Sequence, residues 1–209
     1  MRDLTLPENR RKLFIEIGMR RCRPGSGSSR EFLLKRTWKR PVTNLNNLIK
    51  ETPFVIVGGI ATRLYMPERM TDDLDILVLT ADAKELYREL EKAGSKIVGE
   101  LSIGGSTWKL PDGTSLDVIE SQQPWVEEAV NNPNLAPDGL PIIALPYLIL
   151  MKMKASRSQD IADLTRMLGG ADESALEAVR KAIKAYFPET LEDLESFIYL
   201  GQLEYKNPS

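Results

Sequence analysis

The chain has no histidine and only one cysteine, Cys22, among its 209 residues. Without histidine, both histidine acid–base catalysis and histidine metal sites are excluded. A single cysteine cannot form an intramolecular disulfide, which fits a reducing compartment. Apolar runs of about 18 residues are also missing, and the N-terminus has no hydrophobic signal core. We therefore expect a cytoplasmic protein that does not enter a membrane.

Charge is distributed unevenly along the chain, although the formal net charge is only −2. Residues 1–41 contain twelve Lys or Arg and four acidic residues, an excess of eight positive charges. Such a basic arm beside an acidic body predicts attraction to a polyanion, most often nucleic acid. A solvated tail around the Gly/Ser-rich residues 23–29 explains the same composition equally well.

The hydrophobic pattern predicts strands mixed with helices, followed by an almost entirely helical C-terminal part. Strands are expected at residues 54–57, 74–79, 96–103, 107–110 and 115–120, and helices at residues 60–66, 81–93, 125–130, 147–155, 158–168, 173–186 and 191–203. This order favours an α/β or α+β core with a C-terminal helical subdomain. The predicted parts are a basic N-terminal arm at residues 1–41, a core at 42–130 and the helical subdomain at 131–209.

Two aspartates at the start of the second predicted strand form the first candidate site. Side chains two residues apart on a strand share a face, so Asp73 and Asp75 lie together, whereas Asp72 has the opposite phase. Two carboxylates on one face repel each other unless a positive charge lies between them. Mg²⁺ meets this need, because it binds one or two carboxylates together with substrate phosphates.

A third carboxylate, Asp117, is the only acidic residue in the apolar segment Leu116–Ile119 of a later predicted strand. If that strand lies beside the first, three carboxylates converge. Three acids around a pair of metal ions suit in-line phosphoryl or nucleotidyl transfer. Asp117 is then the best candidate to accept the proton of the attacking hydroxyl. Each feature alone is weaker evidence for a metal site, since Asp-x-Asp is common by chance and a strand after a turn often carries one exposed acid.

Gly58 and Gly59 follow the first predicted strand and precede a helix. Glycines there suit a backbone that closely approaches a phosphate, and they suit a plain strand-to-helix turn as well. Their value as a signal lies in the order of the motifs: apolar strand, Gly-Gly, helix, Asp-x-Asp strand, later Asp strand.

That order resembles the nucleotidyltransferase superfamily with the DNA polymerase β-like fold, on the segments VGGIATRLYMPERMTDDLDILV and SLDVI. The run Arg69-x-Thr71-x-Asp73-x-Asp75 and the later MKMKASRSQDIADL resemble its AbiEii-type branch, known as toxins of toxin-antitoxin pairs. The resemblance covers about residues 54–168. It implies a small mixed sheet flanked by helices, with Asp73, Asp75 and Asp117 as catalytic residues and ligands of Mg²⁺ or Mn²⁺.

The resemblance also implies that Gly58, Gly59, Arg69, Lys152, Arg157 and Asp160 bind the nucleotide. From the residues alone, Lys152, Arg157 and Asp160 form either a phosphate-facing group across a helix break at Ser156 or an ordinary exposed helix surface with one ion pair. Gly59 departs from the pattern, because many superfamily members have Ser there. Without that hydroxyl, backbone amides would have to contact the triphosphate.

The function implied is transfer of an NMP from an NTP to a hydroxyl acceptor, with release of pyrophosphate. The basic arm favours RNA, such as a tRNA end, as acceptor, while a protein or small molecule stays open. A cognate antitoxin is an expected partner. The alternative is a catalytically silent member that acts as a binding or antitoxin-like partner, for which the missing Ser at Gly59 is the sequence support. The oligomeric state is not indicated by the sequence.

Overall fold

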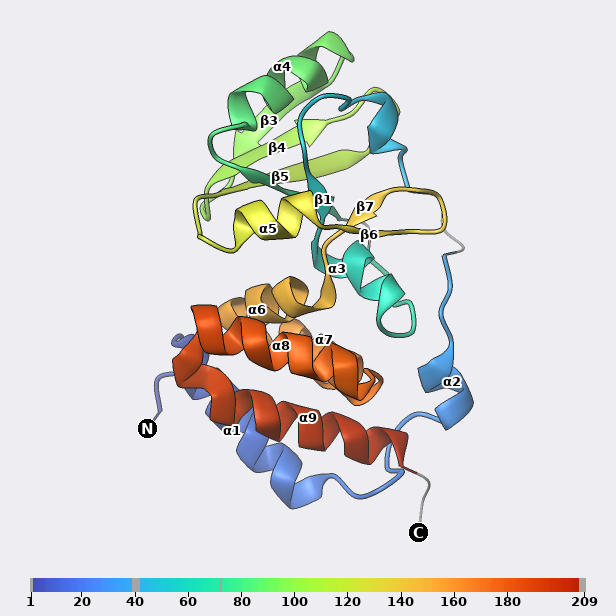
Figure 1. The fold of residues 1–209 in the computed structure, drawn as a ribbon, viewed down its shortest axis with the longest axis vertical. Coiled ribbons are helices and arrows are strands. Elements are labelled where there is room, and N and C mark those ends of the chain that lie inside the picture. Colours follow the sequence, from blue (N-terminus) through green and yellow to red (C-terminus); the bar gives the residue numbers. More distant parts are fainter. Residues whose placement is uncertain (1, 39–41, 72, 207–209) are drawn as a thin grey trace. The chain divides into compact units, whose positions relative to one another are not determined.

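A computed structural model describes residues 2–38, 42–71 and 73–206 and divides the chain into two compact units (Figure 1). The sheet unit comprises the described parts of Trp38–Leu64 and Glu68–Ala144. The helical unit comprises those of Met1–Thr37, Tyr65–Pro67 and Leu145–Ser209. The architecture is α/β, as predicted.

Within the described residues, seven strands form one mixed sheet in the order β3-β4-β5-β2-β1-β7-β6. They are β1 (Val55–Ile56), β2 (Leu74–Leu79), β3 (Lys96–Glu100), β4 (Gly105–Lys109), β5 (Ser115–Ser121), β6 (Asn134–Leu135) and β7 (Pro141–Ile142). The pairs β2/β5 and β1/β7 are parallel, and the other neighbours are antiparallel. The two longest strands, β2 and β5, therefore lie side by side in the middle of the sheet.

Alternation along β2 and β5 fixes which face of the sheet is buried. Leu74, Ile76 and Val78 of β2 are almost fully buried, as are Leu116 and Val118 of β5. Since side chains alternate between faces, the aspartates between these residues are placed on the other face.

Short helices complete the sheet unit: α3 (Gly58–Ala61), α4 (Ala83–Lys92), α5 (Val126–Asn131), and the single-turn segments η1 (Leu45–Asn47) and η2 (Thr62–Leu64). Helix α4 buries Leu86 and Leu90, which lie one turn apart on the same face. Gly94 follows its end with a φ of 86°, a conformation that favours glycine at a helix C-terminus.

The helical unit contains α1 (Pro7–Arg21), α2 (Arg30–Leu34), α6 (Leu145–Ala155), α7 (Ser158–Gly169), α8 (Glu173–Tyr186), η3 (Pro188–Thr190) and α9 (Leu191–Tyr205). Helix α7 crosses α9 very closely, because a Cβ added to Gly201 would lie 2.1 Å from the carbonyl oxygen of Thr165. Within the described residues, no helix combines the length and the apolar character that crossing a membrane requires.

The two compact units of the structure have other bounds than the three parts described from the sequence. Residues 131–144 contribute β6 and β7 to the sheet, whereas the described residues up to Thr37 belong with the C-terminal helices. Helix α1 packs on α9 and α7. Its Arg11 is buried, donating to the carbonyl oxygen of Met153 at 3.0 Å and forming an ion pair with Asp193 at 2.8 Å. The N-terminal segment is thus part of a folded unit.

Candidate active site

Asp75 and Asp117 are direct neighbours in the parallel pair of β2 and β5, because their Cα atoms are register partners. Register partners on adjacent strands point to the same face, so the two carboxylates lie side by side. The strand order that the three-carboxylate hypothesis required is therefore present for these two. Both side chains are half-buried at the face opposite the apolar one.

The Gly-Gly turn lies directly against the first of these carboxylates. Strand β1 ends where the amide of Val57 donates to the carbonyl oxygen of Asp75 at 2.9 Å. Gly58 follows with a φ of 64°, and a Cβ added to it would lie 1.9 Å from Oδ2 of Asp75. Glycine is therefore required at position 58 both by its backbone conformation and by the approach of the carboxylate.

Gly59 is crowded by a different pair of side chains. A Cβ added to Gly59 would lie 2.8 Å from Oγ1 of Thr71, 3.0 Å from Cβ of Thr71 and 3.1 Å from Nη2 of Arg69. The segment that leads into β2 thus folds over the turn and brings a hydroxyl and a guanidinium to it. Arg69, which the resemblance places in the nucleotide site, is brought next to Gly59.

A hydrogen bond from the neighbouring strand orients Asp117. The hydroxyl of Thr107 on β4 donates to Oδ1 of Asp117 at 2.6 Å, and the two residues are register partners. Thr107, Asp117 and Asp75 therefore form a row across β4, β5 and β2. Sequence reasoning missed Thr107. A hairpin closed symmetrically by the predicted turn at residues 111–114 would pair Thr107 with Val118, so the sequence alone did not place Thr107 opposite Asp117.

Asp73 is exposed and lies one residue before β2 begins. Asp72, which the sequence assigned to the opposite phase, lies outside the described residues. Among the described residues, no group of three or more Cys, Asp and Glu side chains forms a cluster that could hold a metal ion alone. The donor set still fits Mg²⁺ or Mn²⁺ bound together with substrate, since two carboxylates in register supply hard oxygen ligands and phosphates supply others.

The remaining predicted site residues form a second group, in the helical unit. The ammonium group of Lys152 is buried and pairs with Asp160 at 3.2 Å and with Asp163 at 2.8 Å. Arg157, just past the α6–α7 break at Ser156, donates from Nε to Asp160 at 2.8 Å. Its side chain is 77% exposed, whereas that of Lys152 is 6% exposed. Arg157 is therefore the member of this group that faces solvent.

Electrostatics hold Asp160 in its charged form. Burial alone would raise its pKa, but the hydrogen bond from Arg157 and the positive charges of Lys152 and Arg157 outweigh it, so the pKa of Asp160 lies below the ordinary value. This group is not an ordinary exposed helix surface, because the side chains of Lys152 and Asp160 are buried and only that of Arg157 is exposed. Its ion pairs across the α6–α7 break join the two helices.

A family model described as "Nucleotidyl transferase AbiEii toxin, Type IV TA system" matches residues 43–204. A search of curated proteins found no significant match. Solved structures with distant similarity include ANT(2'')-Ia in complex with adenylyl-2''-tobramycin, at 20% identity and a TM-score of 0.39 over 72% of this chain and 88% of that one.

A Thermotoga maritima CCA-adding enzyme complexed with tRNA is 15% identical, with a TM-score of 0.37 over 88% of this chain and 54% of that one. A CCA-adding enzyme in complex with CTP is 14% identical, with a TM-score of 0.36 over 81% of this chain and 49% of that one. At these scores the likeness to solved structures is distant, and the family assignment depends on the family model, which spans most of the chain. The chain therefore belongs to the AbiEii nucleotidyltransferase toxin family, and it is a nucleotidyltransferase.

Proposed function

We propose that this enzyme transfers an NMP from an NTP to a hydroxyl of an RNA acceptor, such as a tRNA end, in a reaction that depends on Mg²⁺ or Mn²⁺. The observation that carries the proposal is the register of Asp75 with Asp117, with the Gly58 turn closed against Asp75. Two adjacent carboxylates and a tight glycine turn are suited to holding a metal-bound triphosphate. Asp73, one residue before the strand, is the third proposed ligand.

The reaction that these residues would support is an in-line displacement. The acceptor oxygen forms a bond to the α-phosphorus, the bond from that phosphorus to the bridging oxygen of the β-phosphate breaks, and pyrophosphate leaves. Asp117, oriented by Thr107, accepts the proton of the attacking hydroxyl. Bound metal ions would neutralise the charge that develops on the attacking and leaving oxygens.

The proposed nucleotide-binding residues lie in two different places, the Gly-Gly turn and the helical unit. Gly58 and Gly59 would let the backbone approach the phosphates, and Arg69 lies beside Gly59 with a positive charge. Arg157 is exposed and oriented by Asp160. Lys152 is engaged by two carboxylates, so we assign it the role of fixing Asp160.

The toxin role, a cognate antitoxin and a cytoplasmic location belong to the same proposal, and the family description supports the first two. A toxin of this kind would inactivate RNA by extending it, and its partner would prevent that. We propose RNA over a protein or small-molecule acceptor because the described part of the N-terminal segment exposes Lys12, Arg20 and Arg21.

The proposal is tested by incubating the protein with total RNA, Mg²⁺ and each of the four α-labelled NTPs in turn. We expect the wild type to label RNA with at least one NTP, and Asp73→Asn and Asp75→Asn to label none. Asp82→Asn is the matched control, since Asp82 follows the opposite end of β2 and should leave labelling unchanged. Equal labelling by Asp75→Asn and the wild type would overturn the proposed site.

A catalytically silent protein gives a different result. It would label no acceptor and show no Mg²⁺-dependent affinity for any NTP by titration calorimetry. Labelling of added protein instead of RNA would keep the reaction and change the acceptor.

A further inference from the structure

The hydroxyl group of Thr71 lies against the turn at Gly59, and the site described so far gives it no role. Oγ1 of Thr71 lies 2.8 Å from the place that a Cβ of residue 59 would occupy. A serine at that position would carry its own hydroxyl on a Cβ at this same point. The side chain of Thr71 therefore reaches, from the segment before β2, the place where the Gly-Gly turn itself has no side chain.

A guanidinium group lies beside this hydroxyl. Nη2 of Arg69 lies 3.1 Å from the same point, so a hydroxyl donor and a guanidinium meet over Gly59. The neighbouring residue of the turn, Gly58, contacts the carboxylate of Asp75, which is a proposed metal ligand. Thr71 and Arg69 would together supply a neutral and a charged donor to a phosphate bound at this turn.

The hydroxyl is available for a ligand. Within residues 2–38, 42–71 and 73–206, Thr71 has no hydrogen-bond partner for its side chain. Thr62, also close to Gly59, differs because its hydroxyl donates to the carbonyl oxygen of Gly59 at 2.7 Å. Thr71 is half-buried, so an unused donor there gains most from a charged acceptor.

We infer that Thr71 is a nucleotide-binding residue, whose hydroxyl donates a hydrogen bond to a phosphate of the NTP beside Gly59. This inference depends on the proposed function and deepens it. It also explains how the turn serves without a serine: the hydroxyl comes from the segment before β2. The same arrangement explains why residue 59 is a glycine, because a side chain there would displace Thr71.

The test compares Thr71→Val, which removes the hydroxyl and keeps the branched shape, with Thr71→Ser, which keeps the hydroxyl. Thr80→Val is the matched control, at the other end of β2. Affinities for the four Mg·NTPs and for Mg·tripolyphosphate are measured by titration calorimetry. We expect Thr71→Val to weaken binding of the preferred NTP and of tripolyphosphate about 10-fold or more. Thr71→Ser and Thr80→Val should stay within about twofold of the wild type.

The outcomes separate the two proposals. If the wild type binds an NTP and Thr71→Val binds it with the same affinity, the role of Thr71 is overturned and the proposed function stands. Weaker NTP binding with unchanged tripolyphosphate binding would overturn the assignment to a phosphate. No NTP binding by the wild type would overturn both. Melting curves of all variants show which of them are folded, and if Thr71→Val is unfolded, Thr71→Ala replaces it in the same comparison.

Discussion

At the scale of single residues, the two glycines of the turn are needed for different reasons. Gly58 has a positive φ and faces Asp75, whereas Gly59 makes room for Thr71 and Arg69. Sequence reasoning could mark the pair but not separate these causes, because the side chains that crowd the turn come from residues ten or more positions later. The carboxylate that crowds Gly58 belongs to Asp75, a proposed metal ligand, so the backbone of the turn is coupled to the proposed site.

Replacing Gly58 by alanine should therefore damage both stability and activity. A Cβ at this position would lie 1.9 Å from Oδ2 of Asp75, so either the carboxylate or the turn must move. Gly113→Ala is the control, because Gly113 has a φ of 86° and no atom within 4 Å of its added Cβ. We expect Gly113→Ala to cost about 1 kcal/mol in free energy of unfolding and to keep full activity.

Gly58→Ala should cost about 2 kcal/mol more than the control, since it adds overlap with a packed side chain to the same backbone strain. Its nucleotidyl transfer should fall to background. Urea unfolding and the RNA-labelling assay measure the two effects. Equal stability losses in the two variants, with activity kept in both, would show that Asp75 can move away without consequence.

The buried ion pairs of Lys152 give a second prediction at this scale. Lys152→Met leaves Asp160 and Asp163 buried without the ammonium group that they share, so we expect a loss of about 3–5 kcal/mol in free energy of unfolding. Arg157→Gln, which removes an exposed cation from the same group, should lose less than about 1 kcal/mol. Urea unfolding at pH 7 compares them. A loss below about 1 kcal/mol for Lys152→Met would mean that water reaches the two carboxylates.

At the scale of elements, the regular segments of the core and of the C-terminal part could be predicted from the sequence, whereas β6, β7 and the N-terminal helix α1 were not. The predicted strand at residues 74–79 and helix at residues 173–186 coincide with β2 and α8. The strands β6 and β7 were missed, because two residues each are too few for alternation and their pairing depends on β1 in a distant part of the chain. Strand phase indicated which face Asp75 and Asp117 occupy, whereas their pairing and the positions of Thr107 and Thr71 depend on strand order, register and loop folding.

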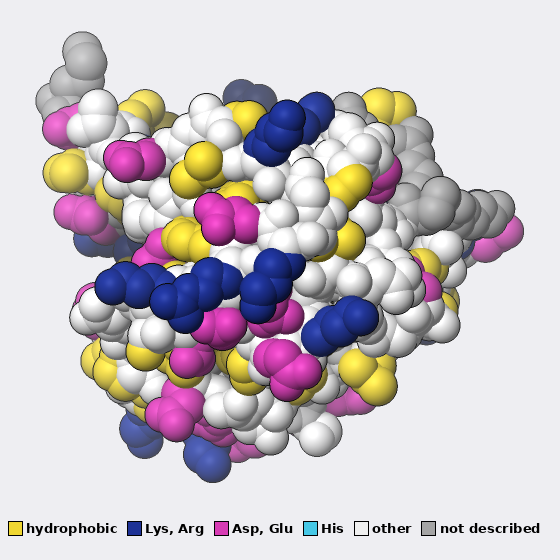
Figure 2. Space-filling model, turned by 90° about the horizontal axis from the view of Figure 1, so that it is seen from above, with side chains coloured by type: hydrophobic (Ala, Val, Ile, Leu, Met, Phe, Trp, Pro, Cys, Tyr) yellow, Lys and Arg dark blue, Asp and Glu magenta, His cyan; other side chains and the backbone are white. Residues whose placement is uncertain are grey.

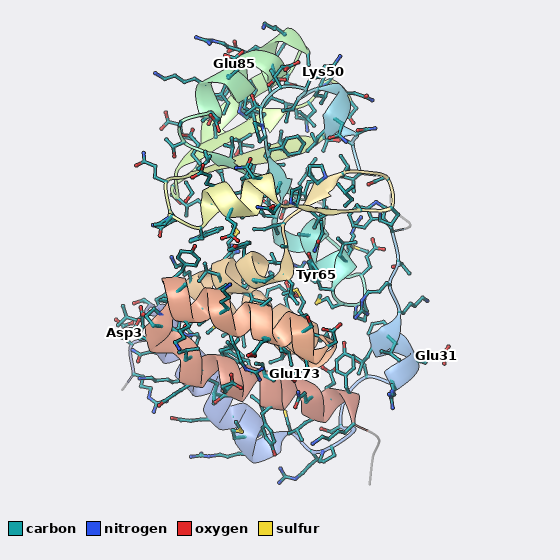
Figure 3. The ribbon with its side chains drawn as sticks, in the orientation of Figure 1. Asp3, Glu31, Lys50, Tyr65, Glu85 and Glu173 are labelled. Carbon is teal, nitrogen blue, oxygen red and sulfur yellow. The ribbon has the colours of Figure 1, made fainter. Side chains whose placement is uncertain are left out.

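Glu89 shows how one element anchors a loop. From α4, its carboxylate accepts hydrogen bonds from the amides of Lys50, Glu51 and Thr52, at 2.5, 3.1 and 2.9 Å, and from the hydroxyl of Thr52. Burial alone would raise its pKa, but these hydrogen bonds outweigh burial and lower the pKa below the ordinary value. The loop leads into β1 and so into the Gly-Gly turn. Figure 3 labels Lys50 and Glu85, which lies one helical turn before Glu89.

The lowered pKa of Glu89 predicts a pH-dependent contribution to stability. The folded state favours the charged form, so the contribution is complete above the ordinary pKa of 4.5 and is lost as the pH falls through the lower folded pKa. Glu89→Gln should therefore be less stable than the wild type at pH 7, and the difference should shrink below about pH 4.5.

The control for this prediction is Glu85→Gln, on the same helix. Glu85 is exposed and pairs only with Arg88 among the described residues, at 2.7 Å. We expect little change in the free energy of unfolding at either pH. Urea unfolding at several pH values measures both variants. A difference between Glu89→Gln and the wild type that grows as the pH falls would contradict the proposed protonation state.

At the scale of the whole molecule, part of the basic excess of the N-terminal segment belongs to the folded structure. Arg10 donates to the carbonyl oxygens of Ser156 and Ala155, and Arg11 to that of Met153, so two of its cations hold the C-terminal end of α6. Deleting the segment would therefore remove folded structure along with charge, and its effect on RNA affinity could not be interpreted. Point substitutions at exposed cations avoid this problem.

Charge is arranged differently on α4. Its cations Lys84, Arg88 and Lys92 alternate with acidic residues, and Figure 2 shows basic and acidic side chains side by side on the face that it draws. Cations interspersed with carboxylates attract a polyanion weakly, because the net field is small. This helix therefore supplies a control set with the same number of exposed positive charges as Lys12, Arg20 and Arg21.

The last prediction compares these two sets of cations in RNA binding. Replacing Lys12, Arg20 and Arg21 together by Gln should weaken binding to single-stranded RNA and lower the slope of log K against log salt concentration by up to about 2, since each phosphate contact on a single strand contributes about 0.7. The triple replacement of Lys84, Arg88 and Lys92 by Gln should change both quantities much less. Fluorescence anisotropy at several salt concentrations measures them, with melting curves to confirm folding. Equal effects of the two triple variants would mean that the N-terminal cations form an ordinary solvated surface and that the acceptor is bound elsewhere.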